Sequence, residues 1–198
     1  MIAILDYGSG NLRSAQRAFE LTDQEVVLTS DPALCLSADG LVVPGVGAYG
    51  ACMEQLISVG GDEIIRNRVA ANKPMLGICV GAQILFSSGS EKGSTQGVGI
   101  FEGDVSLIDS PILPHMGWNN VKTGTGSLLL EGLDGASFYF VHSYAAKSDI
   151  SDATTSWCEY GEPFIAAIER GPVSATQFHP EKSSANGARL IKNWAATL

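Results

Sequence analysis

The sequence predicts an α/β fold: a central, mostly parallel sheet flanked by helices on both faces, with an added region of mixed or antiparallel strands. Over residues 1–86, apolar runs of strand length alternate with stretches in which apolar residues recur at helical spacing. From Gly97 onward, short strand-like runs follow one another with turn residues between them. A length of 198 residues suits one domain, and no repeat, linker or low-complexity tract divides residues 1–198.

The first half has the order expected of a parallel sheet, β-α-β-β-α-β. The expected elements are a strand (2–5), a helix (11–21), strands (26–29 and 40–43), two helices (49–59 and 62–71), a strand from residue 73, and a helix over residues 82–86. Gly8 and Gly10 follow the first strand, but Arg13 stands where a dinucleotide-binding fingerprint needs its third glycine. No cofactor is therefore expected.

The second half reads as short strands closed by one helix. The strand-like runs are residues 105–108, 120–122, 138–141, 155–158, 165–168 and 173–176. The helix begins near Ser184, and its expected buried stripe consists of Ala188, Ile191, Trp194, Ala195 and Leu198.

Composition excludes several classes of function. The formal net charge of −9 argues against nucleic acid and anionic membranes as partners. The first residues carry no basic segment, and the apolar stretch ends at Asp6, so no signal peptide is expected. The four cysteines lack metal-binding spacing, which predicts free thiols in a reducing cytoplasm and neither a disulfide framework nor a structural metal.

The segment Gly77-Ile78-Cys79-Val80-Gly81 is the strongest candidate for chemistry. It stands between a buried strand and an apolar helix, where glycines permit a sharp and closely packed turn. Free N–H groups at the start of the following helix favour thiolate over thiol, so Cys79 is expected to be a nucleophile. The arrangement is a nucleophile elbow with sulfur in place of oxygen. A small residue that only fills a tight turn is the alternative.

Of the three histidines, only His179 has an acid placed to assist it. Pro180 stiffens the segment His179-Pro180-Glu181, and residues two apart in an extended segment point to the same side. Glu181 can then accept one ring N–H while the other ring nitrogen faces Cys79. His115 and His142 are interpreted as structural histidines or pocket wall. If Cys79 and His179 form an ion pair, their titrations are coupled and activity falls in acid.

A thiol that transfers acyl groups also needs donors for an oxyanion. The backbone N–H of Val80, next to the nucleophile, is one expected donor. The loop Pro44-Gly45-Val46-Gly47 is the expected source of the second, from Val46 or Gly47. Its glycines leave room for a peptide to rotate, so a hole that forms only on activation is compatible with the sequence.

Together, the loop 44–47, the segment 77–83 and His179-Pro180-Glu181 resemble the class I glutamine amidotransferases, and the resemblance covers the whole chain. It implies that Cys79 attacks the glutamine side-chain amide to give a γ-glutamyl thioester, that His179 protonates the departing ammonia and then activates water, and that Glu181 holds the imidazole. The positions that match the family's glutamine cradle are the Gly47 backbone, Gln83, Glu91, Ser143 and Tyr144.

Within the family, residues 6–11, 114–119 and 179–183 are similar to the glutaminase subunits of imidazole glycerol phosphate synthases. This implies a heterodimer with a (β/α)₈-barrel cyclase, which uses the ammonia in histidine biosynthesis to make imidazole glycerol phosphate and an aminoimidazole carboxamide ribotide. Trp118, Tyr139 and Lys182 match interface positions at the mouth of the ammonia path. Val80 and Ala82 stand where the family commonly has Leu and Met, both apolar exchanges.

Three other functions remain open on the sequence. The chain can serve another synthase, for pyridoxal phosphate or anthranilate, although Lys182 and residues 114–119 argue against this. It can be a stand-alone cysteine hydrolase on the same fold, active without a partner. It can also be a catalytically silent binding subunit, against which the Cys-His-Glu set speaks.

Overall fold

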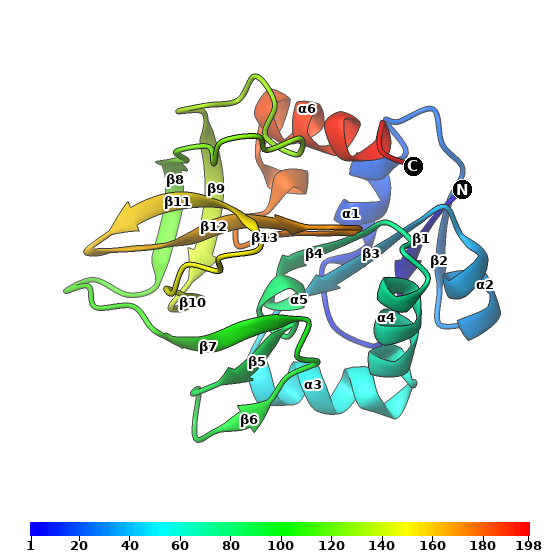
Figure 1. Cartoon of the computed structure of the whole chain (residues 1–198), viewed down its shortest axis with the longest axis horizontal. Helices are drawn as coiled ribbons and strands as arrows, with labels where there is room; N and C mark the ends of the chain where they lie inside the picture. Colours follow the sequence, from blue (N-terminus) through cyan, green and yellow to red (C-terminus); the bar gives the residue numbers. More distant parts are fainter.

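A seven-stranded sheet forms the centre of the computed structural model, which describes residues 1–198 (Figure 1). The strand order is β11-β12-β13-β4-β3-β1-β2. The five strands from β13 to β2 run parallel, whereas β12 and β11 are antiparallel to their neighbours. The bounds are β1 Ile2–Leu5, β2 Val26–Thr29, β3 Gly40–Gly45, β4 Met75–Cys79, β11 Thr154–Tyr160, β12 Glu162–Arg170 and β13 Val173–Thr176.

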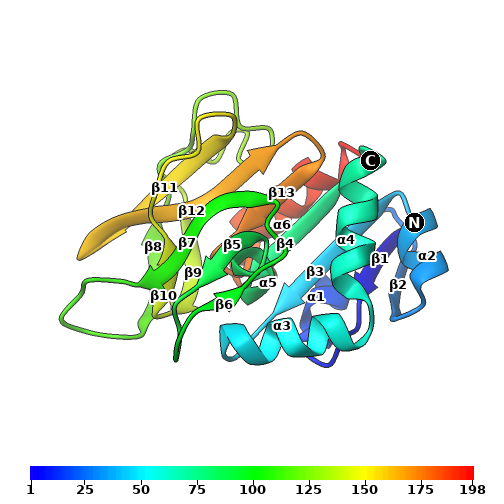
Figure 2. The same cartoon turned by 60° about the horizontal axis from the view of Figure 1, so that its bottom comes forward.

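Helices cover both faces of this sheet. Helices α1 (Leu12–Phe19) and α6 (Ser184–Ala195) lie on one face, and α3 (Tyr49–Ser58) and α4 (Gly61–Ala70) on the other (Figures 1 and 2). The short α2 (Pro32–Ser37) packs beside α4. Every residue of β3 and β4 is buried, because helices shield both faces of these central strands. None of the helices has the length and apolar character needed to cross a membrane.

Two smaller sheets flank the carboxyl ends of the parallel strands. One has the order β10-β7-β5-β6, with β5 Phe86–Gly89, β6 Thr95–Gln96, β7 Phe101–Leu107 and β10 Tyr144–Ala146. The other is the antiparallel pair β8 (His115–Asn120) and β9 (Ser137–His142). The chain returns from β13 through the single-turn 3₁₀ helix η1 (Pro180–Lys182), which contacts β9 and α6.

The expected parallel core with an added mixed region is confirmed, but its element order is wrong at one point. No helix was expected between the second and third strands, and α2 lies there. Its start signals are local: Asp31 accepts a bond from the Ala33 N–H, and Pro32 occupies the first turn. At six residues, α2 is too short for its apolar spacing to stand out in the sequence.

The helix expected over residues 82–86 is also wrong. Helix α5 is a single turn, Val80–Gln83, and β5 begins at Phe86. The Ile84 and Leu85 carbonyls, which a longer helix would use internally, accept bonds from the Val98 and Ile100 N–H groups instead. The turn therefore offers local N–H groups behind Cys79 rather than the dipole of a long helix.

Two smaller expectations need correction. The strand expected over residues 120–122 lies earlier, as β8, and Lys122 only makes an isolated bridge to Trp157. In the last helix, Ile191 and Trp194 are buried as expected, whereas Ala188, Ala195 and Leu198 are only partly buried. Gly187 and Leu190 complete the stripe, because the helix face is rotated slightly from the expected one.

A fully buried arginine joins the amino ends of the central strands to α2. The Arg68 guanidinium donates four hydrogen bonds of 2.7–3.0 Å to the carbonyls of Cys35, Ala38, Asp39 and Pro74. Two of these carbonyls lie at the end of α2, where a cation is favoured. Burial lowers the pKa of Arg68, but the carbonyl oxygens replace the water that its charge requires.

Replacement of Arg68 by methionine is expected to lower the free energy of unfolding by roughly 3 kcal/mol or more, because it leaves several buried carbonyls without a donor. Urea denaturation measures the change. Arg66→Met is the matched control: Arg66 lies two residues away, is 49 % exposed and pairs only with Asp62, so its loss is expected to cost about 0.5 kcal/mol. Equal effects of the two substitutions would contradict the role given to Arg68.

Candidate active site

Cys79 ends β4 in a strained backbone conformation. Its φ of +55° and ψ of −115° lie outside the regions that a side chain normally allows. The flanking glycines are needed for close packing rather than for positive φ. A Cβ on Gly77 would lie 2.8 Å from the Gly81 carbonyl oxygen, and one on Gly81 would lie 2.0 Å from that of Val43. The elbow expected from the sequence thus exists, but the cysteine itself has the unusual angle.

Cys79 and His179 line the same cavity, at the carboxyl end of the parallel strands. The Cys79 Sγ lies 4.0 Å from the Val141 carbonyl oxygen and from Gln177 Nε2. The Nδ1 atom of His179 lies 2.8 Å from Glu181 Oε1, and both side chains are 3 % exposed. The acid therefore lies behind the imidazole as expected, but the expected extended backbone is wrong: Pro180–Lys182 form the 3₁₀ turn η1, and this turn brings Glu181 to the ring.

The pKa of His179 reflects these two partners. Burial by itself lowers this pKa, but hydrogen bonds to Cys79 and Glu181, and the negative charges these groups carry, outweigh burial and raise it to about 9. The imidazole is therefore protonated at neutral pH when it faces the sulfur. Such a cation favours a thiolate nearby and can give its proton to a departing amine.

The backbone of β9 holds His179 in place. The Tyr139 carbonyl accepts a bond from the His179 N–H, and the Tyr139 N–H donates to Ser183 Oγ. Ser183 Oγ in turn donates to the His179 carbonyl at 2.6 Å. These bonds bring β9, η1 and the start of α6 together around the imidazole, so its position is set before any substrate binds.

The cavity, of about 290 Å³, brings together ten of the residues that the sequence singled out: Val46, Gly47, Cys79, Val80, Gln83, Glu91, Ser143, Tyr144, His179 and Lys182. Glu181 lies behind His179 and does not line the cavity. Trp118 and Tyr139 lie outside it, with their rings 6.1 Å apart in an edge-to-face pair. No group of three or more His, Cys, Asp or Glu side chains is placed to hold a metal ion.

One of the backbone N–H groups expected to bind the oxyanion, that of Val46, is already hydrogen-bonded within the protein. The Val46 N–H donates to Ser9 Oγ at 3.1 Å, and Ser9 Oγ donates back to the Val46 carbonyl at 3.0 Å. Tyr7 holds the preceding peptide, because its hydroxyl donates to the Pro44 carbonyl at 2.5 Å. Gly47 follows at φ +87°, which glycine adopts readily. The Val46 N–H can reach an oxyanion only if this peptide rotates away from Ser9.

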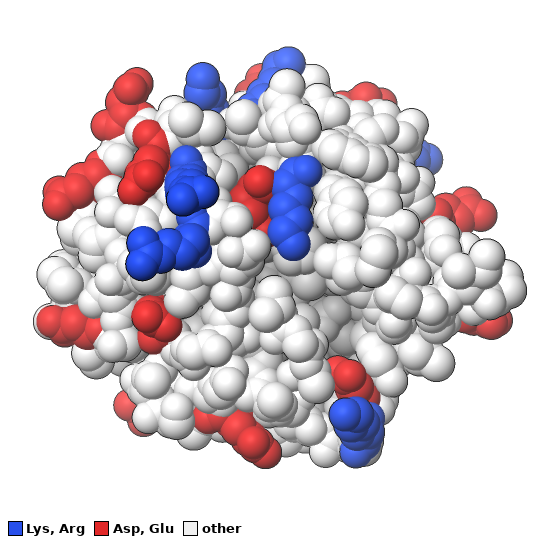
Figure 3. Space-filling view, turned by 180° about the vertical axis from the view of Figure 1, so that it is seen from behind, with Lys and Arg blue, Asp and Glu red and all other residues white.

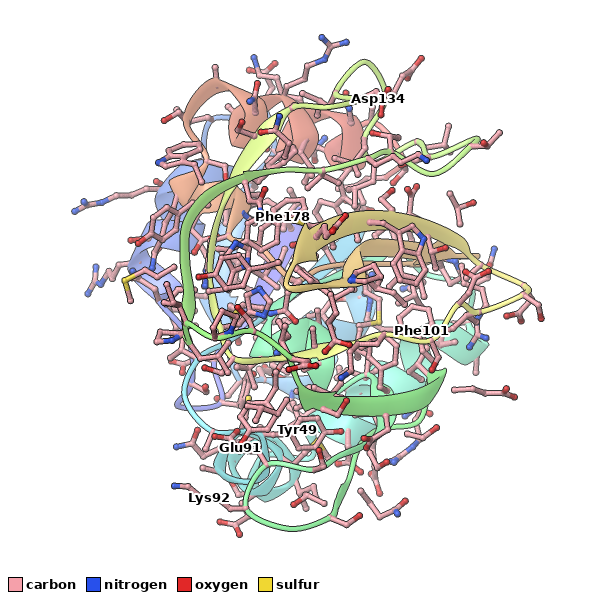
Figure 4. The ribbon with its side chains drawn as sticks, turned by 90° about the vertical axis from the view of Figure 1, so that its left-hand side faces the viewer. Tyr49, Glu91, Lys92, Phe101, Asp134 and Phe178 are labelled. Carbon is pink, nitrogen blue, oxygen red and sulfur yellow. The ribbon has the colours of Figure 1, made fainter.

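The four side chains that match the glutamine cradle surround the cavity, two of them held by bonds within the protein. Gln83 Nε2 donates to the Tyr144 carbonyl at 2.8 Å and to Gln177 Oε1 at 3.0 Å. Glu91 approaches the start of α3, where its Oε2 accepts the Tyr49 N–H at 2.8 Å (Figure 4). Ser143 and Tyr144 are partly buried and line the same cavity. These walls present carboxylate, hydroxyl and backbone groups to a small polar molecule.

Sequence reasoning missed several residues of the site. Ser9, Tyr7 and Gln177 act through hydrogen bonds to residues far away in the chain, and no local pattern indicates such bonds. Pro114 and Val141 add apolar lining. His142 is both pocket wall and a hydrogen-bonded structural histidine, so the interpretation given to it is confirmed.

The model of the family "Glutamine amidotransferase class-I" matches residues 3–198. The chain belongs to the class I glutamine amidotransferases. Among curated relatives, "Imidazole glycerol phosphate synthase subunit HisH" of Mycolicibacterium paratuberculosis (strain ATCC BAA-968 / K-10) is 53 % identical, covering 100 % of this chain and 98 % of the relative. The subunit of the same name from Bifidobacterium longum (strain NCC 2705) is 50 % identical, covering 98 % of each chain.

Solved structures described as a glutamine amidotransferase and as a glutaminase domain share the fold at low sequence identity. A crystal structure described as a glutamine amidotransferase matches with a TM-score of 0.78 and 17 % identity over 98 % of both chains. The glutaminase domain of Trypanosoma brucei CTPS, with bound acivicin, matches with a TM-score of 0.68 and 17 % identity, over 98 % of this chain and 93 % of that one. The expected amidotransferase fold is therefore confirmed.

The charge state of His179 can be tested directly, because its ring is paired with the buried Glu181. The ring of His179 is expected to titrate near pH 9 by NMR, and Glu181→Gln is expected to lower the midpoint toward 6.5, because the carboxylate stabilises the imidazolium. Glu63→Gln, in the first turn of α4, is the control and leaves the midpoint unchanged. A wild-type midpoint near 6.5 would contradict this account.

The same pair links stability to pH. The folded-state pKa of His179 lies above the unfolded value of about 6.5, so its stabilising contribution is complete below pH 6.5 and is lost as the pH rises through about 9. The free-energy difference between wild type and Glu181→Gln, measured by denaturation, should therefore shrink over that interval.

Ser9→Ala is expected to raise glutamine hydrolysis by the isolated chain at least fivefold. The substitution removes both hydrogen bonds between Ser9 Oγ and Val46, each of about 1 kcal/mol, and the loss of even one of them shifts a two-state population by about that factor. Steady-state release of glutamate measures the effect. Ser58→Ala, an exposed serine that bonds only to its own helix, is the control. An unchanged or lower rate in Ser9→Ala would show that these bonds do not restrain the loop.

Proposed function

We propose that this chain is the glutaminase subunit of an imidazole glycerol phosphate synthase and that it supplies ammonia to a (β/α)₈-barrel cyclase. One observation carries the proposal: Cys79 and His179 line a single cavity, with the buried Glu181 bonded behind the imidazole, in a chain that is about 50 % identical, over its whole length, to named subunits of that synthase. Glutamine, as the donor of the ammonia, follows from the family.

The reaction begins with attack of the Cys79 thiolate on the carbonyl carbon of the glutamine side chain. The carbonyl oxygen becomes an oxyanion, stabilised by the Val80 N–H and by a second N–H from the Val46–Gly47 segment. His179 gives its proton to the amide nitrogen, the C–N bond breaks, and ammonia leaves a γ-glutamyl thioester. His179 then takes a proton from water, the hydroxide attacks the thioester, and glutamate departs as the thiolate is restored.

Glutamine is oriented by several groups that line the cavity. Glu91 has one oxygen committed to the Tyr49 N–H, and its charge suits the α-ammonium group. Ser143 and Tyr144 line the same cavity and add a hydroxyl and backbone groups. Gln83 supports this lining through its bond to the Tyr144 carbonyl.

The partner is proposed to bind the face on which Lys182 and β8 lie. Lys182 lines the cavity and is exposed, which suits the mouth of an ammonia path. Near it, the outward side chains Met116 and Trp118 of β8 are 62 % and 53 % exposed, an unusual share for large apolar residues. Figure 3 shows basic side chains over α1 and η1 in the middle of this face, whereas most acidic ones lie toward the rim. An apolar patch beside basic residues suits an acidic protein surface.

Glutamine hydrolysis with and without the cyclase and its nucleotide tests the proposal. The complex is expected to release glutamate at least tenfold faster than the isolated chain, because the partner completes the oxyanion hole. Cys79→Ala is expected to abolish hydrolysis, whereas Cys35→Ala, at a buried cysteine outside the cavity, is the control. Hydrolysis by Cys79→Ala at the normal rate would refute the proposal.

Competing partners separate the remaining alternatives. Full stimulation by the synthase for pyridoxal phosphate or for anthranilate, and none by the cyclase, would assign the chain to another pathway. Rapid hydrolysis of peptides or esters without a partner would make it a stand-alone hydrolase.

A further inference from the structure

A chain of buried hydrogen bonds crosses the protein from β8 to the wall of the cavity. Asn119 Nδ2 lies 3.3 Å from His115 Nε2, His115 Nδ1 lies 3.0 Å from His142 Nε2, and His142 Nδ1 lies 3.0 Å from the Tyr144 carbonyl oxygen. The two histidines are 3 % and 6 % exposed. Neither has a part in the reaction described above.

The groups at the two ends of this series of hydrogen bonds determine which ring nitrogen of each histidine carries the proton. A carbonyl oxygen only accepts, so His142 Nδ1 carries a proton that it donates to Tyr144. A neutral His142 then has a bare Nε2, which accepts from Nδ1–H of His115, and the bare Nε2 of His115 accepts from the Asn119 amide. The second Asn119 N–H donates to the Glu159 carbonyl at 3.0 Å. All donors therefore point from β8 toward the cavity.

The surroundings keep both rings neutral and fixed. His115 stacks on Tyr160 and Phe140, with centroids 4.0 and 4.8 Å away, and Phe164 packs edge-on against both imidazoles. Burial lowers the pKa of His115 to about 4 and that of His142 to about 3. A proton added to His142 would bring two N–H groups face to face.

The two ends of this series of hydrogen bonds, Asn119 and the Tyr144 carbonyl, have different surroundings. At one end, Asn119 lies on β8 beside the exposed Trp118. At the other, the Tyr144 carbonyl accepts bonds from both His142 and Gln83, in the wall assigned to glutamine. Asn119 and Tyr144 are 25 residues apart along the backbone, but the hydrogen bonds through the two histidines join them directly. A shift of β8 therefore changes the orientation of the Tyr144 peptide.

We propose that His115 and His142 are positioning residues, a neutral and unidirectional relay that fixes the Tyr144 peptide for glutamine and couples it to the partner-facing strand β8. The inference rests on the proposed function for its substrate. Neither imidazole exchanges protons with glutamine, because both nitrogens of each ring are committed within the relay.

The tautomers of His115 and His142 test the relay without an activity assay. Both rings are expected to be neutral with the proton on Nδ1, the minority tautomer of free imidazole, from pH 5 to 9. Two-dimensional NMR of the ¹⁵N-labelled imidazoles identifies the protonated nitrogen. An Nε2-protonated ring at either position, or a charged ring at pH 6, would overturn the assignment.

Replacement of His115 tests the positioning role. His115→Phe keeps the aromatic stack and removes the donor to His142, whereas His115→Asn keeps a donor near the position of Nδ1. In the complex with the cyclase and its nucleotide, His115→Phe is expected to raise KM for glutamine about tenfold with kcat changed less than twofold. His115→Asn is expected to recover most of this loss. Phe164→Leu disturbs the same aromatic cluster without breaking the relay and is the matched control.

Labelling of Cys79 separates positioning from loss of structure. In His115→Phe, a glutamine-like electrophile is expected to label Cys79 about tenfold more slowly than in wild type, and iodoacetamide at the wild-type rate. If both reagents label Cys79 equally slowly, or if Phe164→Leu changes KM as much as His115→Phe does, His115 is only a structural residue and does not position the Tyr144 peptide. If the wild-type complex does not hydrolyse glutamine, the proposed function fails, while the NMR result still decides the relay.

Discussion

The site depends on the close approach of two backbones, the end of β3 and the turn that follows β4. A Cβ on Gly45 would lie 2.3 Å from the Gly81 nitrogen, and one on Gly81 would lie 2.0 Å from the Val43 carbonyl oxygen, so neither position accepts a side chain. This contact sets Cys79 beside the loop 44–47 and leaves Cys79 with a positive φ. A nucleophile and its expected oxyanion donors are thus brought together by backbone packing, before any polar interaction contributes.

Burial and hydrogen-bond partners then give the three histidines different charge states: one is a cation and two are neutral. His179 faces a carboxylate and a thiol, and its pKa rises to about 9 despite burial. Burial lowers the pKa of His142 to about 3, although its bond to the Tyr144 carbonyl opposes this fall. The neutrality of His142 matters for His179, because a second cation nearby would weaken the imidazolium that the reaction requires. The site therefore has one charged imidazole, held by Glu181, and one neutral imidazole in its wall, His142, which is backed by His115.

The sequence predicted the parts of the site whose geometry is local. Cys79 between glycines and His179-Pro180-Glu181 are short segments whose backbone and spacing determine where their side chains point, and the parallel order of the strands brings both to one edge of the sheet. The residues expected to bind glutamine came from the resemblance to a known family, because their spacing in the sequence does not point to a common site. Long-range bonds could not be predicted: Ser9 to Val46, Gln177 to Gln83, and the Ile84 and Leu85 carbonyls that end α5 after one turn.

The distribution of these bonds indicates where control of the reaction acts. The imidazole of the proposed triad is already held in place, because His179 is bonded to β9, Ser183 and Glu181. Val46 is different: its N–H and its carbonyl, which belong to neighbouring peptides, both bond to the Ser9 hydroxyl at 3.0–3.1 Å, and each bond is of a kind worth about 1 kcal/mol. Rotation of one peptide is a smaller rearrangement than repositioning a buried ion pair, whose separation costs several kcal/mol. On the proposed function, a partner that binds beside Lys182 would therefore regulate the rate through the loop 44–47, while Cys79, His179 and Glu181 stay in place.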